Sequence, residues 1–269
     1  MSPQSAGLSD VDLHYEPKVD IPPPPYRRDT RFIFARLARA VVNEVAAGGP
    51  GRVLDVGCGY GIQLRRLHAR GCEPWGLDAS AALLGYCRRQ AAEHGAALVL
   101  VLGVAERLPF RAASFDQVIC QGSLDHFAQP RAFMSEVARI LKPEGRAIIA
   151  LANFDSLACI LARSLYRTKE ALNLPLRTDH RPFWQIPDNH TFKGNLRVLE
   201  SLGRPWLEME RCYGISLLWL FTRWSLFLEA LPEDTARGLL RAADHIAYHL
   251  PGAADMIISV WRPRAKSWH

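Results

Sequence analysis

The sequence predicts an α/β protein in which a mostly parallel sheet is covered by helices on both faces. Three observations predict this fold. Between about residues 27 and 153, apolar strand-like runs alternate strictly with segments of helical periodicity. The strand-like runs are apolar at nearly every position, as expected for strands buried on both faces. A glycine-rich turn, VLDVGCGYG at residues 53–61, follows the first run, at the sheet edge where parallel sheets bind ligands.

The elements of this first part follow one another in a regular order. Phe34, Leu37, Val41 and Val45 recur at helical spacing and are followed by Gly48-Gly49, which predicts an opening helix that ends there. The same reading predicts five strands, within residues 52–57, 73–80, 96–110, 115–122 and 146–153. It predicts three further helices, within residues 61–71, 81–95 and 130–141.

Beyond residue 153 the chain departs from simple alternation. It returns to a helix, a strand and a closing strand, expected at residues 191–203, 206–214 and 254–263. Two insertions, at about residues 154–190 and 214–253, separate these elements, and we expect the second to be a helical pair broken at Pro232. The first insertion carries four side chains that could face a ligand, His180, Arg181, Trp184 and His190. The alternative is that its histidines are surface residues.

The chain ends and the cysteines bear on location. Residues 1–26 contain IPPPP and predict an irregular arm, which leaves residues 27–269 as one domain. The first twenty residues have no apolar stretch typical of a signal peptide. Six cysteines form neither a C-x-x-C pair nor a Cys/His cluster, which favours a reducing compartment, and therefore the cytoplasm.

The charge balance does not by itself indicate a partner. The formal net charge is +6, carried by 28 arginines and 5 lysines. The arginines are scattered at spacings typical of solvated helix faces, so we expect no nucleic-acid partner. Hydrophobic and charged contents of 49% and 22% are those of a globular protein. The oligomeric state cannot be predicted from these numbers.

The glycine turn indicates a nucleoside ligand without a pyrophosphate. Gly57, Gly59 and Gly61 allow a tight turn that brings backbone N–H groups against a ligand. A dinucleotide fingerprint needs a third glycine where this chain has Ile62, which disfavours a nicotinamide dehydrogenase. Asp55 lies two residues before the first glycine; its carboxylate would repel a pyrophosphate but accept hydrogen bonds from an ammonium group.

A second acidic residue lies at the end of the next strand. Asp78 ends the run WGLD, where a carboxylate can accept both hydroxyl groups of a ribose. The alternative is that Asp78 or Ser80 caps the helix that begins near residue 81. The third strand ends in GVAERLPF, where an adenine ring could lie against Leu108 and Phe110 and bond to the backbone at Ala105 and Glu106.

Five motifs, in this order, carry a resemblance to a known family. VLDVGCGYG, GLDAS, GVAERLPF, SFDQVICQGSLDHF and LKPEGRAII resemble the successive motifs of class I S-adenosylmethionine-dependent methyltransferases, most closely the bacterial small-molecule group that includes quinone-biosynthesis methyltransferases. The resemblance covers about residues 50–153. It implies a Rossmann-like, seven-stranded, mostly parallel sheet, with helical lid insertions and an antiparallel last strand between two parallel ones.

The same resemblance implies roles for individual residues toward S-adenosylmethionine. The turn from Gly57 to Gly61 holds the methionine end, Asp55 contacts the amino group, and Asp78 binds the ribose hydroxyls. The remaining residues implied to border the cofactor are Cys58, Ala79, Ala105, Glu106 and Gln121. Val104 is a departure, because many relatives carry there an aspartate that receives the adenine amino group.

Methyl transfer requires little of the protein beyond alignment and removal of the acceptor's proton. His126, in CQGSLDHF after the fourth strand, is the candidate general base because histidine titrates near neutral pH. The alternative is that His126 only packs at the start of the next helix. Asp125 and Cys120 are weaker candidates. No acidic cluster follows that strand, so we expect no metal.

The second insertion bears on the acceptor. Residues 214–232 are apolar nearly all round a helix, with a narrow polar stripe, and Arg223 argues against a membrane span. The aromatic residues that could line an acceptor pocket or rest on a lipid surface are Trp219, Phe221, Trp224 and Phe227. Burial in an ordinary core is the alternative. We therefore expect a methyltransferase for a small, apolar or amphipathic acceptor, favouring O- or C-methylation. A non-catalytic cofactor-binding regulator of the same fold is the alternative function.

Overall fold

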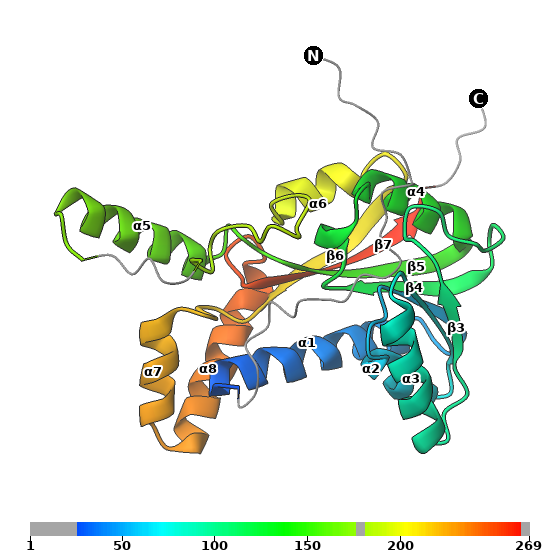
Figure 1. The fold of residues 1–269 in the computed structure, drawn as a ribbon, viewed down its shortest axis with the longest axis horizontal. Coiled ribbons are helices and arrows are strands. Elements are labelled where there is room, and N and C mark those ends of the chain that lie inside the picture. The colour runs from blue at the N-terminus through cyan, green and yellow to red at the C-terminus, as the bar shows by residue number, and fades with distance from the viewer. Residues whose placement is uncertain (1–25, 176–180, 265–269) are drawn as a thin grey trace, which may run out of the picture.

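A computed structural model describes residues 26–175 and 181–264 and shows one seven-stranded sheet in the order β3-β2-β1-β4-β5-β7-β6 (Figure 1). The strands are β1 (Arg52–Val56), β2 (Glu73–Asp78), β3 (Val99–Leu102), β4 (Phe115–Gln121), β5 (Leu141–Ala152), β6 (Leu207–Ile215) and β7 (Met256–Pro263). β1 to β5 pair in parallel, whereas β7 is antiparallel to β5 and to β6. The predicted Rossmann-like sheet, with its antiparallel last strand between two parallel ones, is confirmed.

Helices are found in the segments where the sequence predicts them, and one more lies in the first insertion, where the sequence had placed no individual helix. They are α1 (Arg28–Ala47), α2 (Ile62–His68), α3 (Ala81–Glu93), α4 (Pro130–Ile140), α5 (Leu157–Ala171), α6 (Leu196–Gly203), α7 (Thr222–Ala230) and α8 (Glu233–His249). A short 3₁₀ turn, η2 (Leu124–His126), follows β4. The pair α7 and α8 is separated at Pro232, as predicted.

The core lies on both faces of the sheet. Along β1, Val53 belongs to the apolar cluster that includes α1, and its neighbour Leu54 belongs to the cluster that includes α4 and α6. Ile148 and Ile149 of β5 divide between the same two clusters. Because successive side chains of a strand point to opposite faces, this division explains why the central strands are apolar at every position.

The second insertion differs from the sequence prediction in one respect. Helix was predicted from residue 214, but β6 continues to Ile215 and α7 begins only at Thr222. In between, Ser216, Leu218 and Leu220 take positive φ angles of 62°, 66° and 65°. Residues with a Cβ atom are strained in this region. Apolar content alone did not reveal this non-helical loop.

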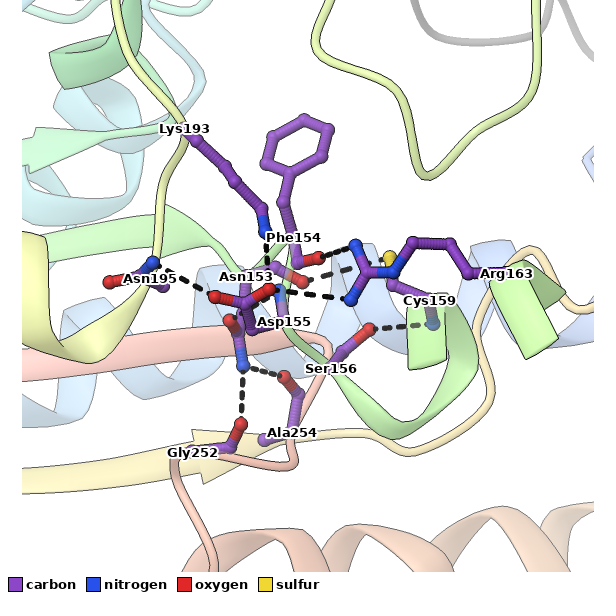
Figure 2. A network of polar contacts seen from close by, with 10 residues as sticks. All are labelled: Asn153, Phe154, Asp155, Ser156, Cys159, Arg163, Lys193, Asn195, Gly252 and Ala254. Carbon is purple, nitrogen blue, oxygen red and sulfur yellow. Dashed lines mark hydrogen bonds and ion pairs between the residues drawn. The ribbon is translucent and has the colours of Figure 1, made fainter. Parts of the chain in front are cut away.

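The base of α5 is fixed by a polar network (Figure 2). Asp155 accepts hydrogen bonds from Lys193 Nζ at 2.5 Å, Asn195 Nδ2 at 2.9 Å and Arg163 Nη2 at 3.3 Å. Burial opposes ionisation of Asp155, but Lys193, Asn195 and Arg163 together hold its pKa below the usual range. Asn153 Nδ2 donates to the carbonyl oxygens that precede β7. The network therefore joins the end of β5 to both ends of the first insertion.

Two further sequence predictions concern the chain ends and membranes. The arm predicted for residues 1–26 lies outside the described residues except for Tyr26, and His180 also lies outside them. Across the described ranges, every helix is too short or too polar to span a bilayer. This finding agrees with the rejection of a membrane span at residues 214–232.

Candidate functional site

The glycine turn lies at the carboxyl end of β1, and the backbone N–H groups of Gly57, Cys58 and Gly59 are bound within the protein. Contacts between the turn and a ligand stay a prediction. The Gly57 and Cys58 N–H groups both donate to the carbonyl oxygen of Leu77, at 2.8 and 3.1 Å, and the Gly59 N–H donates to Asp78 Oδ2 at 2.8 Å. A Cβ atom at Gly59 would meet no atom within 4 Å. The turn therefore leaves room for a ligand to approach the backbone closely beside Gly59.

The other two glycines are required by protein contacts. A Cβ atom at Gly57, where φ is 74°, would lie 2.4 Å from Ser123 Oγ. A Cβ atom at Gly61, where φ is 68°, would lie 2.1 Å from Cys87 Sγ on α3. Both distances are far below van der Waals contact, so these glycines let the loop after β4 and helix α3 close onto the turn.

Asp78 has a structural role that is distinct from helix capping. Its Oδ2 accepts from Gly59 N–H and its Oδ1 from Ser80 N–H, both at 2.8 Å. The side chain of Ser80 caps α3 by accepting from Leu83 N–H at 3.2 Å. Of the two capping candidates, Ser80 is therefore the cap. Asp78 and the adjacent Ala79 are half-buried at the end of β2.

Asp55 gives the site its electrostatic character. Its carboxyl group is buried in β1, with 4% of the residue exposed. Burial, and to a lesser extent the negative charge of Asp78, raise the pKa of Asp55 to about 7. Two neighbouring carboxylates in a poorly solvated edge favour a cationic ligand, because a cation stabilises both ionised forms.

The other residues predicted beside the cofactor lie on β4 and after β3. Gln121 Oε1 accepts from Gln63 Nε2 at 2.5 Å. Ala105 is 4% exposed, and Glu106 Oε1 accepts from the Gln129 N–H at 3.3 Å. These groups border the same sheet edge as Asp55 and Asp78, and their contacts with a cofactor stay predictions.

The thiols of the cysteines near the site are expected to be unreactive. Burial raises the pKa of the Cys58 thiol, and burial raises that of the Cys120 thiol well above its usual range. A thiol in this state is a poor nucleophile. Cys58 packs instead in an apolar cluster with Leu64, Leu84 and Cys87. The weaker candidate Cys120 is therefore a core residue of β4.

The loop after β4 brings together three ionisable side chains. His126, the predicted base, is exposed, and its Nδ1 lies 3.2 Å from the carbonyl oxygen of Asn189. His190 Nδ1 lies 3.1 Å from Oδ2 of the buried Asp125. The two imidazole rings meet edge to face, with centroids 4.5 Å apart. We refer to Asp125, His126 and His190 as the histidine cluster.

The sequence named His190 among four insertion residues that could face a ligand, but nothing in it placed His190 beside Asp125 and His126. Its position follows from the next residue. Thr191 donates its N–H to the carbonyl oxygen of Asp125 at 2.7 Å and its hydroxyl to that of Phe127 at 2.8 Å. Pairing of the insertion's final residues with the loop after β4 is a tertiary contact that spacing alone does not predict.

The aromatic residues of the second insertion have divided roles. Trp219 precedes α7; its backbone N–H donates to Asp255 Oδ2 at 2.8 Å and its Nε1 to Thr30 Oγ1 at 3.1 Å. Ser225, a residue of the narrow polar stripe in this segment, is buried and donates to Asp29. Phe227 is 49% exposed. One face of α7 is therefore bound to α1, and the opposite face is open.

Comparisons with known proteins agree with this geometry. The family model for the methyltransferase domain matches residues 54–149. A ubiquinone biosynthesis O-methyltransferase from Paracidovorax citrulli (strain AAC00-1) is 34% identical over 174 residues, covering 61% of this chain and 71% of that protein. One from Cronobacter sakazakii (strain ATCC BAA-894) is 33% identical over 128 residues, covering 47% of this chain and 53% of that protein. The chain spans about half, or less, of the length of most curated relatives that it matches.

Solved structures extend the likeness over the whole fold. Magnesium protoporphyrin IX methyltransferase from Synechocystis PCC 6803, solved with bound SAH, superposes with a TM-score of 0.57. The superposition covers 87% of this chain and 86% of that one at 18% identity. PH0226 from Pyrococcus horikoshii OT3 gives the same TM-score over 88% of this chain and 92% of that one, at 18% identity. At such low identity the likeness concerns the fold alone.

Proposed function

The chain belongs to the S-adenosylmethionine-dependent methyltransferases, and we propose that it transfers a methyl group to an oxygen of a small, apolar or amphipathic acceptor. One observation carries the proposal: Asp55 and Asp78 lie beside each other at a glycine turn that is open at Gly59. The cofactor of this family, S-adenosylmethionine, carries a sulfonium and an ammonium group together with a ribose. Its charge and its hydroxyl groups complement these two carboxylates.

The carboxylates would hold different ends of the cofactor. Each oxygen of Asp78 accepts one backbone N–H group, and a carboxylate oxygen has a second lone pair. Asp78 can therefore bind ribose hydroxyls without giving up its contacts with Gly59 and Ser80. Asp55 is deeper and would receive the ammonium group, whose charge would restore the ionised state of its carboxyl group. Gln121, Cys58, Ala79, Ala105 and Glu106 would complete the pocket.

The acceptor's proton is assigned to His126. A carbonyl oxygen can only accept, so the contact with Asn189 makes His126 Nδ1 the donor. This tautomer leaves Nε2 of His126 as the nitrogen that can accept a proton. The exposure of His126 at the carboxyl end of β4 supports this role.

Exposed apolar side chains on the inserted helices support an apolar or amphipathic acceptor. Figure 1 shows α5 and α7 at the same end of the molecule. α5 exposes Leu161 and Leu165 by 39% and 45%, and α7 exposes Leu226 and Phe227 by 55% and 49%. The ubiquinone biosynthesis enzymes among the relatives are O-methyltransferases by name, which supports oxygen as the methylated atom. Contact of this end with a lipid surface is part of the same proposal. The six free cysteines support action in the cytoplasm.

Calorimetry with S-adenosylhomocysteine tests the cofactor assignment. We expect a dissociation constant in the micromolar range, or roughly 7–8 kcal/mol, and no heat of binding with NAD. Transfer of a labelled methyl group from S-adenosylmethionine to phenolic acceptors with and without a prenyl tail then tests the reaction. Cofactor binding without transfer to any acceptor would favour the non-catalytic regulator, and absence of cofactor binding would exclude both functions.

A further inference from the structure

We propose that the histidine cluster, Asp125, His126 and His190, is a binding site for one divalent transition-metal ion. Each residue offers one ligand atom, and the three atoms lie within 4.8 Å of one another. Two residues come from the loop after β4 and the third from the end of the first insertion, about sixty residues later in the chain. Two imidazoles and one carboxylate on one side of an ion form a common open coordination set.

Asp125 supplies the strongest argument for a cation. The residue is 3% exposed, and its Oδ1 has no hydrogen-bond partner among the described residues. Its Oδ2 lies 3.1 Å from His190 Nδ1. A buried carboxylate oxygen without a partner is unfavourable, since it has lost water and gained nothing in exchange. A metal ion bound at this oxygen would remove that penalty.

His126 is already oriented as metal-ligating histidines usually are. Its Nδ1 donates to the carbonyl oxygen of Asn189 at 3.2 Å, an outer contact that fixes the tautomer and makes Nε2 the free donor atom. Because His126 is exposed, the side of the cluster that it forms borders solvent. An ion held there by three protein ligands would keep coordination positions for water or for an acceptor.

The backbone around the cluster is fixed, so binding requires only side-chain movement. Thr191 ties the two segments together through its N–H and its hydroxyl, both bound to carbonyl oxygens of the loop after β4. The ring of Phe154 packs edge-on against His190 at 5.7 Å. Ligands at about 2.0–2.2 Å from one ion lie at most about 4.4 Å apart. The cluster must therefore contract slightly, within the reach of side-chain rotations.

The donor set selects the kind of ion. Imidazole nitrogens suit zinc, iron and similar ions, whereas magnesium and calcium prefer oxygen ligands throughout. We therefore expect the cluster to bind zinc and cobalt with much higher affinity than magnesium. Imidazole and carboxylate must be deprotonated to bind, so affinity should weaken as the pH falls below neutrality.

The role of the ion, unlike its binding, rests on the proposed function. An acceptor hydroxyl that coordinates the ion would lose its proton to water, because the cation stabilises the oxygen anion. The oxygen would then form a bond to the methyl carbon while the carbon–sulfur bond breaks and its electron pair returns to sulfur. In the metal-loaded protein His126 would act as a ligand, and in the metal-free protein as the base.

Metal titration of the full chain tests the site directly. The protein is stripped with EDTA, dialysed, and titrated with Co²⁺ while visible absorption is recorded, then with Zn²⁺ in a calorimeter. We expect one equivalent to bind with micromolar affinity or better and with the absorption bands of a nitrogen-ligated cobalt ion. His190→Ala should weaken affinity at least tenfold. Equal affinity in wild type and His190→Ala would overturn the proposal.

A second histidine pair provides the matched control. His245 and His249 lie one turn apart on α8, both exposed, with ring centroids 5.3 Å apart. His249→Ala should leave the cobalt spectrum unchanged; a spectrum lost only in this variant would place the metal on α8 and refute the proposed site. Asp125→Asn conserves volume and should also lose the metal, so it serves if His190→Ala fails to fold. S-adenosylhomocysteine affinity, measured in parallel, tests the proposed function separately, since metal binding does not depend on it.

Discussion

The half of the molecule that contains the sequence motifs differs from the half that contains the insertions in how completely its groups are paired and packed. Around the glycine turn, the backbone N–H groups of Gly57, Cys58 and Gly59 are bound within the chain. Gly57 and Gly61 cannot be replaced without overlap, because a Cβ atom there would lie 2.4 Å and 2.1 Å from a neighbouring side chain. In the inserted half, a buried oxygen of Asp255 has no described partner, and α5 and α7 expose large apolar side chains. The first half is built around a shape common to a family. In the second, under the proposed function, the exposed apolar side chains would meet the acceptor.

Among substitutions that test this comparison, we expect the largest loss of stability at Gly61. Gly61→Ala places a Cβ atom 2.1 Å from Cys87 Sγ at a positive φ, so the free energy of unfolding should fall by about 3 kcal/mol. Gly59→Ala, whose Cβ meets no atom within 4 Å, should lower it by about 1 kcal/mol and weaken cofactor binding instead. Urea denaturation and calorimetry measure both quantities.

A second substitution separates two effects of Gly61→Ala: overlap of the new Cβ atom with Cys87, and backbone strain at a positive φ. Gly61→Ala combined with Cys87→Ala removes the sulfur atom that the new Cβ would strike. Unfolding free energy should then recover by about 1–2 kcal/mol relative to Gly61→Ala. If the double variant is no more stable than the single one, the close approach of α3 to the turn is not what requires glycine there.

Asp78→Ala should have the next largest effect, on binding. The substitution removes the acceptor for two backbone N–H groups as well as the expected partner of the ribose hydroxyls. We expect S-adenosylhomocysteine affinity to fall by about 1–3 kcal/mol, with a smaller loss in Asp78→Asn, which keeps one acceptor oxygen. Unchanged affinity in the alanine variant would contradict the ribose assignment.

The pH dependence of binding tests the deeper carboxylate. The folded-state pKa of Asp55 is raised to about 7 from 3.8, so its contribution to stability is present below pH 3.8 and is lost as the pH rises to about 7. Binding of a cationic ligand favours the ionised form, so affinity should rise about tenfold between pH 6 and pH 8. Asp55→Asn should flatten both profiles, measured by calorimetry and thermal melting.

The smallest effect on stability is expected on the exposed face of α7. Leu226→Ser with Phe227→Ser should change the unfolding free energy by less than about 0.5 kcal/mol, because both side chains are half-exposed. The same variant should raise KM for a prenylated acceptor and reduce flotation with anionic liposomes. Ile246→Ser, at a residue of α8 that is 52% exposed, is the matched control and should behave as wild type. Equal KM and flotation in all three proteins would leave this face without a role in acceptor binding.

The sequence predicted the strands and helices of the motif half because each of its features is local. An apolar run predicts β1 whatever lies around it, and a glycine at a positive φ, such as Gly61, is needed wherever a turn is that tight. The histidine cluster could not be predicted in this way, because His190 lies beside His126 through tertiary bonds of its neighbours Asn189 and Thr191, which cross more than sixty residues. The left-handed residues Ser216, Leu218 and Leu220 carry no local signal, since only tertiary contacts hold such side chains at a positive φ.

The position of β7 has a consequence for how the protein is made. Among the described strands, β6 pairs only with β7, and β7 is the later of the two along the chain. During synthesis the domain can assemble from β3 to β5 early, but β6, α7 and α8 then leave the ribosome before β6 has a strand to pair with. Until β7 emerges, the edges of β5 and β6 are both unpaired and prone to intermolecular association. Chains that terminate before residue 256 should therefore aggregate. The yield of the intact protein should depend on slow translation, or on chaperone binding, between the synthesis of β6 and that of β7.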